Sequence, residues 1–380
     1  MTPETVLYGR AWIRGSLTDR TVVSMQDGRL VDVATTADPP PNARRVAGVI
    51  VPGFIDVHVH GGASADFMDG SEEGDAAILA FHARHGTTAL AATTLSGSQE
   101  NLRTAVEAVA RTAAATPPGA EICGIHLEGP YINPRKAGAQ ARSAIRPPSI
   151  HELEALRAAA PNLRWIVTLA PEIEGTRVMM EHFRGQVLFS IGHTAASFGD
   201  TVLALESGAN HFTHLFNAMP PLHHREPGVI GAALISTDAT VELIADGIHV
   251  HPAILRFVGQ ALPRRVALIT DAVRACGMPD GTYRLYDLEI TVAEGAARLA
   301  DGTLAGSVLT MSQAVKNMVE LAGLPLEMVL PLATEVPARI LGVEGRKGKL
   351  AVGYDADVVV LSDRLEAEQV FVRGAELSRG

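Results

Sequence analysis

The middle of the chain alternates between two patterns of hydrophobic and polar residues. Short apolar, β-branched runs predict strands over residues 88–94, 121–127, 164–169, 187–191, 211–215, 241–245 and 266–270. Longer mixed stretches between and after these runs predict helices over residues 72–85, 101–114, 150–159, 198–207, 252–261, 311–322 and 335–341. This alternation indicates repeated strand–helix units.

Residues 49–62, VIVPGFIDVHVHGG, add one more strand before these units. Its apolar residues alternate with Asp56, His58 and His60, so the two histidines stand on one side of the strand. Eight such units predict an α/β fold, with the parallel strands closed into a TIM-like (β/α)8 barrel. A doubly wound open sheet is the alternative, but no Gly-rich dinucleotide fingerprint follows the first strand.

Both ends of the chain have the character of β structure. Residues 1–48 contain short alternating runs around Asp27-Gly28, a strong hairpin signal, and residues 348–361 and 369–372 are also predicted to be strands. We therefore expect a small β-sandwich domain built from residues 1–48 and 344–380. The barrel, residues 49–343, is inserted between its two parts, and residues 283–299 form an additional hairpin.

Composition and charge exclude several classes of protein. The formal net charge of −10 over 380 residues argues against non-specific nucleic-acid binding. No run approaches the roughly 18 uncharged apolar residues of a membrane span, and the N-terminus has no signal-peptide core. The two cysteines do not make a disulfide framework, which favours a reducing compartment. These observations predict a cytoplasmic protein.

Polar residues recur where the predicted strands end. In a barrel the carboxyl ends of the strands converge on one pocket. Each residue has a less specific explanation, since Glu128 or Asp271 could cap a turn or a helix and a lone histidine is often an ordinary core residue. Their repetition favours a site, because carboxylates and imidazoles together form a ligand set for a zinc or ferrous-type ion. The residues concerned are His58, His60, Glu128, His193, His214, Asn217, Asp246, His249, His251 and Asp271.

Several motifs carry a resemblance to a known family. The HVH motif after PGFID, the distributed histidines and the final strand aspartate resemble the amidohydrolase superfamily. The ordered motifs HLEGP, IGHT, HLFNAM, REPGVIGA, DGIHV, TDA and DGTLAGS are similar to the N-acetylglucosamine-6-phosphate deacetylase family. This resemblance implies that Glu128, His193 and His214 are the principal metal ligands. His58 and His60 match a second metal site that only some members have, so the resemblance implies one or two divalent ions per subunit, with zinc or iron expected.

The resemblance also implies an activity, the metal-dependent deacetylation of N-acetyl-D-glucosamine 6-phosphate to D-glucosamine 6-phosphate and acetate, in amino-sugar catabolism and recycling. Asp271 would accept the proton of the attacking water and return it to the leaving nitrogen, and His249 would help to stabilise the oxyanion. The residues that it assigns to substrate binding are Ala139, Gln140, Asn217, Ala218, Arg225, Asp246, Gly247, Ile248, His249, Leu304, Ala305 and Gly306. Arg225 is the expected phosphate contact, although from the residues alone a surface arginine paired with Glu226 is an equal alternative. A homodimer paired across the phosphate site is also expected.

Two features of this chain differ from those of some relatives. Gln140 stands where some members have histidine, so substrate recognition by its loop can differ. None of the four lysines ends a mid-barrel strand, so Glu128, and not a carboxylated lysine, is the expected bridge between two ions. Other substrates stay open, namely another N-acetylated amino sugar or an N-acyl amino acid. A catalytically inactive sugar-phosphate sensor is a further alternative.

Overall fold

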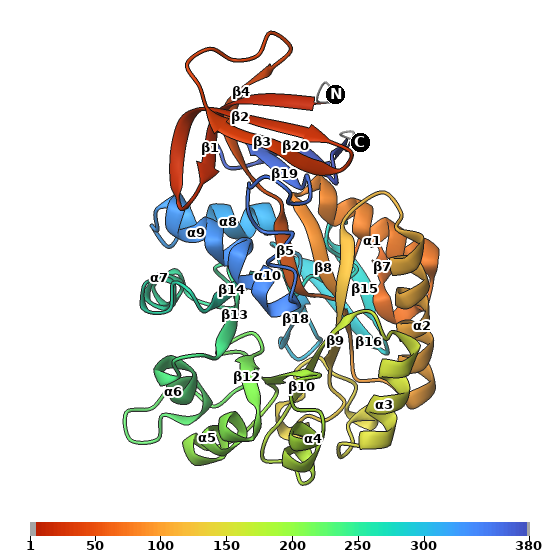
Figure 1. The fold of residues 1–380 in the computed structure, drawn as a ribbon. Coiled ribbons are helices and arrows are strands. Elements are labelled where there is room, and N and C mark those ends of the chain that lie inside the picture. Colours follow the sequence, from red (N-terminus) through yellow and green to blue (C-terminus); the bar gives the residue numbers. More distant parts are fainter. Residues whose placement is uncertain (1–4, 378–380) are drawn as a thin grey trace.

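The structure is a computed structural model that describes residues 5–377, and its centre is a parallel barrel (Figure 1). Eight strands follow one another in chain order around the sheet, as the sequence predicted. Side chains on both faces are buried, because the barrel interior is packed and the helices cover its outside. The strands are β5 (Phe54–Val59), β8 (Thr87–Thr94), β9 (Glu121–Glu128), β10 (Arg164–Leu169), β11 (Leu188–Ile191), β12 (Ala209–Phe212), β13 (Thr240–Ile244) and β14 (Val266–Ile269).

The seam between β5 and β14 is closed just beyond the end of β14. The backbone N–H of Asp271 donates to the carbonyl of His58 over 2.9 Å, and the N–H of His60 donates to the carbonyl of Ala272 over 2.9 Å. Below them, the hydroxyl of Thr270 donates to the buried carboxylate of Asp56 over 2.5 Å. This closure fixes the residues after β14 against the first barrel strand.

Helices follow most barrel strands and cover the outside of the sheet. A serine begins each of α1, α2, α3 and α5, with its hydroxyl accepting from a backbone N–H of the first turn, a common helix start. The helices are α1 (Glu72–Arg84), α2 (Gln99–Ala115), α3 (Ile150–Ala159), α4 (Thr176–His182), α5 (Phe198–Ser207), α6 (Gly228–Ile235), α7 (Pro252–Ala261), α8 (Met311–Glu320), α9 (Leu326–Ala333) and α10 (Glu335–Leu341). Among residues 5–377, none of these helices is both long and apolar enough to cross a membrane.

Three helices were not predicted from the sequence. Helix α4 is short, α6 is buried on nearly every side and therefore lacks an amphipathic period, and α9 contains Pro331.

The first and last strands of the described chain share one sheet, which lies above the barrel in Figure 1. Its order is β21-β20-β19-β4-β1-β2-β3, so β4 lies beside strands from both ends of the chain. The sheet curls around one core that includes Leu7 and Val23 from the first part and Val358 and Phe371 from the second. It is thus one curled sheet that encloses a sandwich-like core. The strands are β1 (Thr5–Ile13), β2 (Ser16–Gln26), β3 (Arg29–Thr35), β4 (Arg44–Pro52), β19 (Val358–Leu361), β20 (Ala367–Val372) and β21 (Ala375–Glu376).

The strands of this sheet differ in detail from the sequence prediction. The hairpin at Asp27-Gly28 is confirmed, with both residues at positive φ as the tight turn requires. Strand β4 continues to Pro52, so the apolar run from Val49 belongs to the sheet built from the two chain ends, and the barrel begins at Phe54. Within the predicted strand 348–361, only Val358–Leu361 is a strand. The residues before it turn back along β3, where the N–H of Leu30 donates to the carbonyl of Tyr354.

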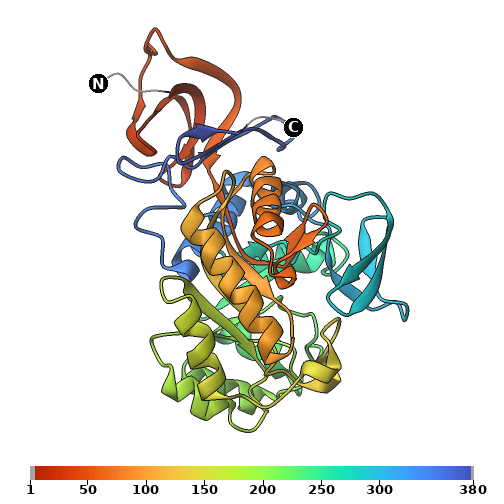
Figure 2. The same cartoon turned by 90° about the vertical axis from the view of Figure 1, so that its right-hand side faces the viewer.

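A small antiparallel sheet projects from the side of the barrel, as Figure 2 shows in cyan and blue. The predicted hairpin is present and is extended to four strands, β15 (Gly281–Leu285), β16 (Leu288–Ala293), β17 (Ala296–Arg298) and β18 (Leu304–Ser307). Strand β18 returns to the barrel, where the N–H of Ser307 donates to the carbonyl of Asp271 over 2.7 Å. This contact brings Leu304 and Gly306 to the carboxyl ends of the strands. Two further short strands, β6 (Gly61–Gly62) and β7 (Ala65–Asp66), follow β5.

Candidate metal centre and active site

Three predicted ligands meet at the carboxyl ends of β9, β11 and β12. Oε1 of Glu128 lies 3.1 Å from Nε2 of His193 and 3.0 Å from Nε2 of His214, and the two Nε2 atoms are 3.1 Å apart. All three residues are buried. Glu128 is the last residue of β9, and the two histidines follow β11 and β12 by two residues each. The barrel therefore brings these side chains together from three separate strands.

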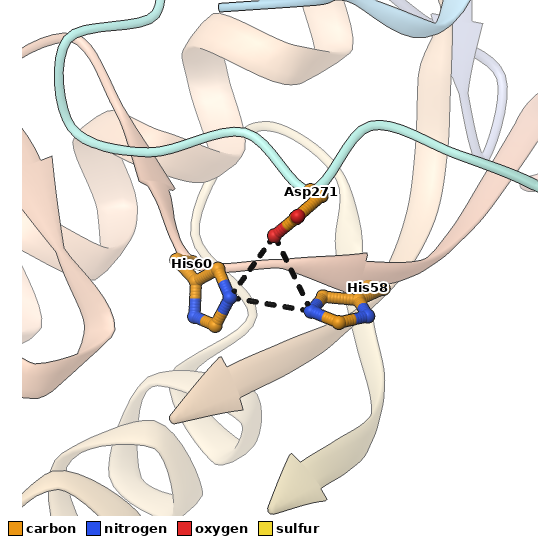
Figure 3. Close-up of side chains that lie close together, drawn as sticks. All are labelled: His58, His60 and Asp271. Atoms are coloured by element: carbon orange, nitrogen blue, oxygen red, sulfur yellow. Dashed lines mark hydrogen bonds and ion pairs between the residues drawn. The ribbon is translucent and has the colours of Figure 1, made fainter. Parts of the chain in front are cut away.

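A second group lies beside the first and consists of His58, His60 and Asp271 (Figure 3). Nε2 of His58 lies 3.2 Å from Nε2 of His60, and Oδ1 of Asp271 lies 3.4 Å and 3.2 Å from these two atoms. Asp271 belongs to the segment after β14 that closes the barrel seam. The backbone hydrogen bond of Asp271 to His58 thus holds the carboxylate over the two imidazoles.

Glu128 faces both groups. Its Oε1 is 3.5 Å from Nε2 of His58, and its Oε2 is 3.3 Å from Nε2 of His60. One carboxylate therefore reaches the donor atoms of both groups, as a ligand shared between two neighbouring ions would.

The donor set fits divalent cations. In each group two imidazole nitrogens and one carboxylate oxygen lie within 4.8 Å of one another. The two Nε2 atoms of each group also approach each other to 3.1–3.2 Å, a contact in which two lone pairs repel unless a proton or a cation lies between them. Imidazole and carboxylate are the ligands that zinc and iron accept in hydrolases.

The charges of the two groups depend on each other. Burial lowers the pKa of His58, but the carboxylates of Glu242, Glu128 and Asp271 outweigh burial and raise this pKa to about 9. Burial raises the pKa of Glu128, yet His58, His193 and His214 hold it well below its usual range. The carboxylates are therefore ionised at neutral pH. Because protons and metal ions compete for the same imidazole nitrogens, cation binding releases protons here.

Three residues of these groups have a strained backbone. The φ angles are 47° for His193, 28° for His214 and 51° for Asp271, in the left-handed region that residues other than glycine rarely adopt. Such conformations persist where the surrounding structure holds them, and they cluster at functional sites. The strain marks the three strand ends at which the chain turns its side chains inward.

A pocket of about 280 Å³ opens beside the two groups. Leu95, Val273 and Leu285 give it an apolar wall, and Arg135 and Lys136 bring positive charge. Many of the predicted site residues line it. They are His60, Glu128, Ala139, Gln140, His193, His214, Asn217, Ala218, His249, Asp271, Leu304 and Gly306.

His249 is oriented by a neighbouring carboxylate. Oδ2 of Asp246 lies 2.6 Å from Nδ1 of His249, and Oδ1 of Asp246 accepts from the backbone N–H groups of Ile248 and His249 over 2.8 Å. With the His249 Nδ1–H donated to Asp246, Nε2 is the ring nitrogen left for the pocket. Asp246 therefore acts on the pocket through His249.

The remaining predicted substrate residues do not line this pocket. They are Arg225, Asp246, Gly247, Ile248 and Ala305. Arg225 lies on an exposed loop before α6, where its guanidinium contacts Nε2 of His224 at 2.7 Å. Within one chain, the cations of the pocket are Arg135 and Lys136.

Several residues of the site were not predicted from the sequence. Arg135 and Lys136 were not assigned to the pocket, because no strand-end rule locates the loop after HLEGP. Glu242 was also missed, although it is fully buried and contacts His58. The available signal was a charged residue inside the apolar strand TVELI.

The chain belongs to the amidohydrolase family, because the family's sequence model matches residues 49–377. It is 39% identical to the N-acetylglucosamine-6-phosphate deacetylase of Bacillus subtilis (strain 168), over 93% of this chain and 91% of that protein. It is 40% identical to the N-acetylgalactosamine-6-phosphate deacetylase of Escherichia coli O157:H7, over 87% and 88% of the two chains. The family expected from the sequence motifs is thereby confirmed.

Solved structures of similar proteins share the whole fold. A mutant N-acetyl-D-glucosamine-6-phosphate deacetylase of Mycobacterium smegmatis, in complex with N-acetyl-D-glucosamine-6-phosphate, has a TM-score of 0.94 and 36% identity, with 100% of both chains covered. The N-acetylglucosamine-6-phosphate deacetylase of Thermotoga maritima has a TM-score of 0.88 and 32% identity, with 100% of this chain and 99% of that chain covered. The barrel and the sheet of the chain ends are both part of this likeness.

Proposed function

We propose that this enzyme hydrolyses the acetamide of N-acetyl-D-glucosamine 6-phosphate to D-glucosamine 6-phosphate and acetate, in amino-sugar catabolism and recycling. The observation that carries the proposal is the pair of ligand groups joined by Glu128 beside the pocket. It is supported by the similarity to deacetylases over almost the whole chain. A cytoplasmic location stays a prediction from the sequence.

Each ligand group is proposed to hold one divalent ion, zinc or iron, with Glu128 shared between them. The ligands are His193 and His214 for one ion and His58, His60 and Asp271 for the other. When bound, such an ion lowers the pKa of water and polarises an amide carbonyl, which an unactivated acetamide requires.

Asp271 is the proposed general base and acid. Its carboxylate lies at the pocket and is ionised, because the neighbouring imidazoles of His58 and His60 lower its pKa although burial raises it. It accepts a proton from the attacking water as the carbon–oxygen bond forms. It then donates this proton to the sugar nitrogen as the carbon–nitrogen bond breaks, so acetate and an amine leave and Asp271 is again ionised. His249, oriented by Asp246, contacts the carbonyl oxygen on which negative charge develops.

The phosphate is proposed to bind at the positively charged side of the pocket, near Asn217, Ala218 and Arg135. Arg225 lies outside the pocket of its own chain, so the phosphate contact expected for it needs a second copy. We infer a homodimer in which the loop of one subunit completes the pocket of its partner.

Subunit complementation tests this arrangement. Arg225→Ala and Asp271→Asn chains are each expected to have low activity alone. When they are mixed and allowed to exchange subunits, one pocket of each heterodimer contains an intact Asp271 and the partner's intact Arg225, so activity returns. A mixture no more active than its components shows that Arg225 acts in its own chain or in none.

N-acetyl-D-galactosamine 6-phosphate is the second candidate substrate. The relative from Escherichia coli O157:H7 that is named for this epimer is 40% identical, so overall similarity does not separate the two sugars. The decisive experiment compares kcat/KM for both phosphorylated sugars and for unphosphorylated N-acetylglucosamine, before and after chelation. The proposed function predicts the highest value for the phosphorylated glucosamine derivative and loss of turnover on chelation. A dead sugar-phosphate sensor would bind these sugars without turnover.

A further inference from the structure

A fully buried carboxylate lies beneath the two ligand groups, on the barrel strand β13. Oε2 of Glu242 accepts from Nδ1 of His58 over 2.9 Å and from the backbone N–H of His214 over 3.1 Å. Oε1 of Glu242 accepts from Nε2 of His211 over 3.0 Å, and Nδ1 of His211 contacts the hydroxyl of Thr240 at 2.6 Å. One carboxylate therefore contacts one residue of each ligand group.

The contact with Glu242 fixes the tautomer of His58. An ionised carboxylate can only accept hydrogen bonds, so Nδ1 of His58 carries the proton in this contact. In the neutral ring the lone pair is then on Nε2, the atom that lies 3.2 Å from Nε2 of His60 and 3.4 Å from Oδ1 of Asp271. Without the acceptor at Glu242, the ring could rotate or move its proton to Nε2, and either change removes the ligand atom.

The second contact of Glu242 supports a strained residue. The backbone of His214 has φ 28°, and the same oxygen that holds His58 accepts from the His214 N–H. A residue in this conformation depends on its surroundings to hold it. Glu242 therefore links the position of His58 to the turn that carries His214.

Stability alone does not account for a charge at this place. A buried ion pair contributes little net stability, and an apolar replacement of similar volume is often neutral or stabilising. Val241 and Leu243 alternate with Glu242 along β13 and face the other side of the sheet, whereas Glu242 lies among His58, His126 and His211. An ionised carboxylate at this fully buried position costs solvation energy that a role in the site explains.

We propose that Glu242 is a positioning residue that presents His58 to the metal through its Nδ1–H and couples this ligand to His214. The inference rests on the proposed function of the two ligand groups and deepens it. Carboxylates that accept from the second nitrogen of a metal-bound histidine orient the ring, and their loss typically lowers metal affinity by roughly 10- to 100-fold.

The test compares metal binding by chelated wild-type protein and by two variants, Glu242→Leu and Glu242→Gln. Co²⁺ is titrated into each protein, with calorimetry for the two affinities and metal analysis after dialysis for the stoichiometry. Leucine removes the acceptor, so the affinity of the ion held by His58 should fall by roughly 10- to 100-fold. The Glu242→Gln variant should lose less affinity for this ion. Its side-chain carbonyl can still accept from His58, while the ring of His211 changes tautomer and accepts from the new amide.

Asp75→Asn is the matched control, because Asp75 is a fully buried carboxylate in α1 whose hydrogen-bond partner is the hydroxyl of Thr112 in α2 and not a residue of the ligand groups. It should leave both affinities unchanged. Should the leucine variant fail to fold, Glu242→Gln in a His58→Ala background decides. If Glu242 acts through His58, Glu242→Gln should hardly lower the remaining affinity of the ion at His60 and Asp271 in this background.

The outcomes separate this inference from the metal site on which it rests. Wild-type protein that takes up a single ion overturns the site at His58 and the inference with it. Two ions bound by wild type and by both Glu242 variants with equal affinities overturn the inference alone. The inference is also overturned if Glu242→Gln lowers the affinity of the ion at His60 and Asp271 as much in the His58→Ala background as in wild type, because Glu242 then acts on that ion without His58.

Discussion

The side-chain amide of Gln140 donates from Nε2 to Oε2 of Glu128 over 2.5 Å. Its Oε1 accepts from the backbone N–H of Ser96 over 2.6 Å, so the amide is held at both ends. The sequence indicated Gln140 only as a substrate contact that differs from the histidine of some relatives. The structure shows that it also restrains the carboxylate shared by the two ligand groups.

Gln140→Ala should weaken metal binding at Glu128. Loss of the donor frees Oε2 of Glu128, and removal of such an outer contact lowers metal affinity about tenfold or more. Gln140→Glu should be more damaging, because it places a second negative charge against Glu128. Metal titration of the chelated proteins measures both effects, and equal affinities in all three proteins would contradict the role.

His193→Ala and His214→Ala should each remove the ion that these residues share with Glu128. The barrel should still fold, because its core consists of apolar side chains from all eight strands. Metal analysis gives the stoichiometry and circular dichroism gives the fold. His182→Ala, which alters an exposed histidine at the end of α4, is the control. Wild-type stoichiometry and activity in either ligand variant would show that the assignment is wrong.

Asp271→Asn should lower kcat by about a hundredfold or more, the usual scale for a lost general acid–base. Asparagine keeps the shape but cannot carry the proton from water to the leaving nitrogen. KM for the sugar phosphate should change little, and the ion at Glu128, His193 and His214 should be retained. The ion held by His58 and His60 should bind more weakly. Near-wild-type turnover would show that Asp271 only closes the barrel seam.

Arg225→Ala should weaken binding of the phosphorylated sugar far more than that of the unphosphorylated one. A lost charge-assisted contact is worth roughly 2 kcal/mol, or about 30-fold in affinity. Arg135→Ala is the informative companion, because Arg135 lines the pocket of its own chain. Arg177→Ala, an exposed change in α4, serves as control. Equal losses on both sugars for Arg225→Ala would show a structural role.

His82 should make the enzyme less stable in acid. It is fully buried in α1, where Nε2 contacts the carbonyl of Gly61 at 2.9 Å, and burial lowers its pKa to about 4. Between pH 6.5 and 4 the unfolded chain binds a proton here that the folded chain does not. The free energy of unfolding therefore falls as pH decreases through this window, by up to about 3 kcal/mol.

His82→Gln provides the comparison, because glutamine can donate to the same carbonyl but does not titrate. Urea unfolding of chelated wild type and variant between pH 4 and 7 measures the difference. The wild-type curve should decline more steeply toward acid, and parallel curves would show that His82 does not contribute.

The sequence located the side chains that follow strands directly. Glu128, His193, His214 and Asp271 each come at or just after an apolar run, and the barrel rule then places them at one end. The sequence could not predict that the carboxylate of Glu128 lies close to both groups, because this depends on distances between strands that are far apart in sequence.

Other residues lie beyond what local pattern determines. Glu242 acts through contacts with His58 and His211 from two other strands, and a single charged residue within a strand does not reveal its partners. Arg135 and Lys136 reach the pocket because their loop folds back over the strand ends. Helix α6, buried on nearly every side, has no polar face by which a helix is recognised.

In the sheet built from the two chain ends, strand β4 lies between β1, which is made before it, and β19, which is made roughly 300 residues after it. Val51 pairs with Val359, and at about 5–20 residues per second the roughly 300 residues between them take about 15–60 s to synthesise. Until then one edge of β4 has no neighbour in its sheet, and open strand edges pair readily with other chains. Each nascent chain on the ribosome therefore carries an aggregation-prone edge from the synthesis of β4 until β19 has been made.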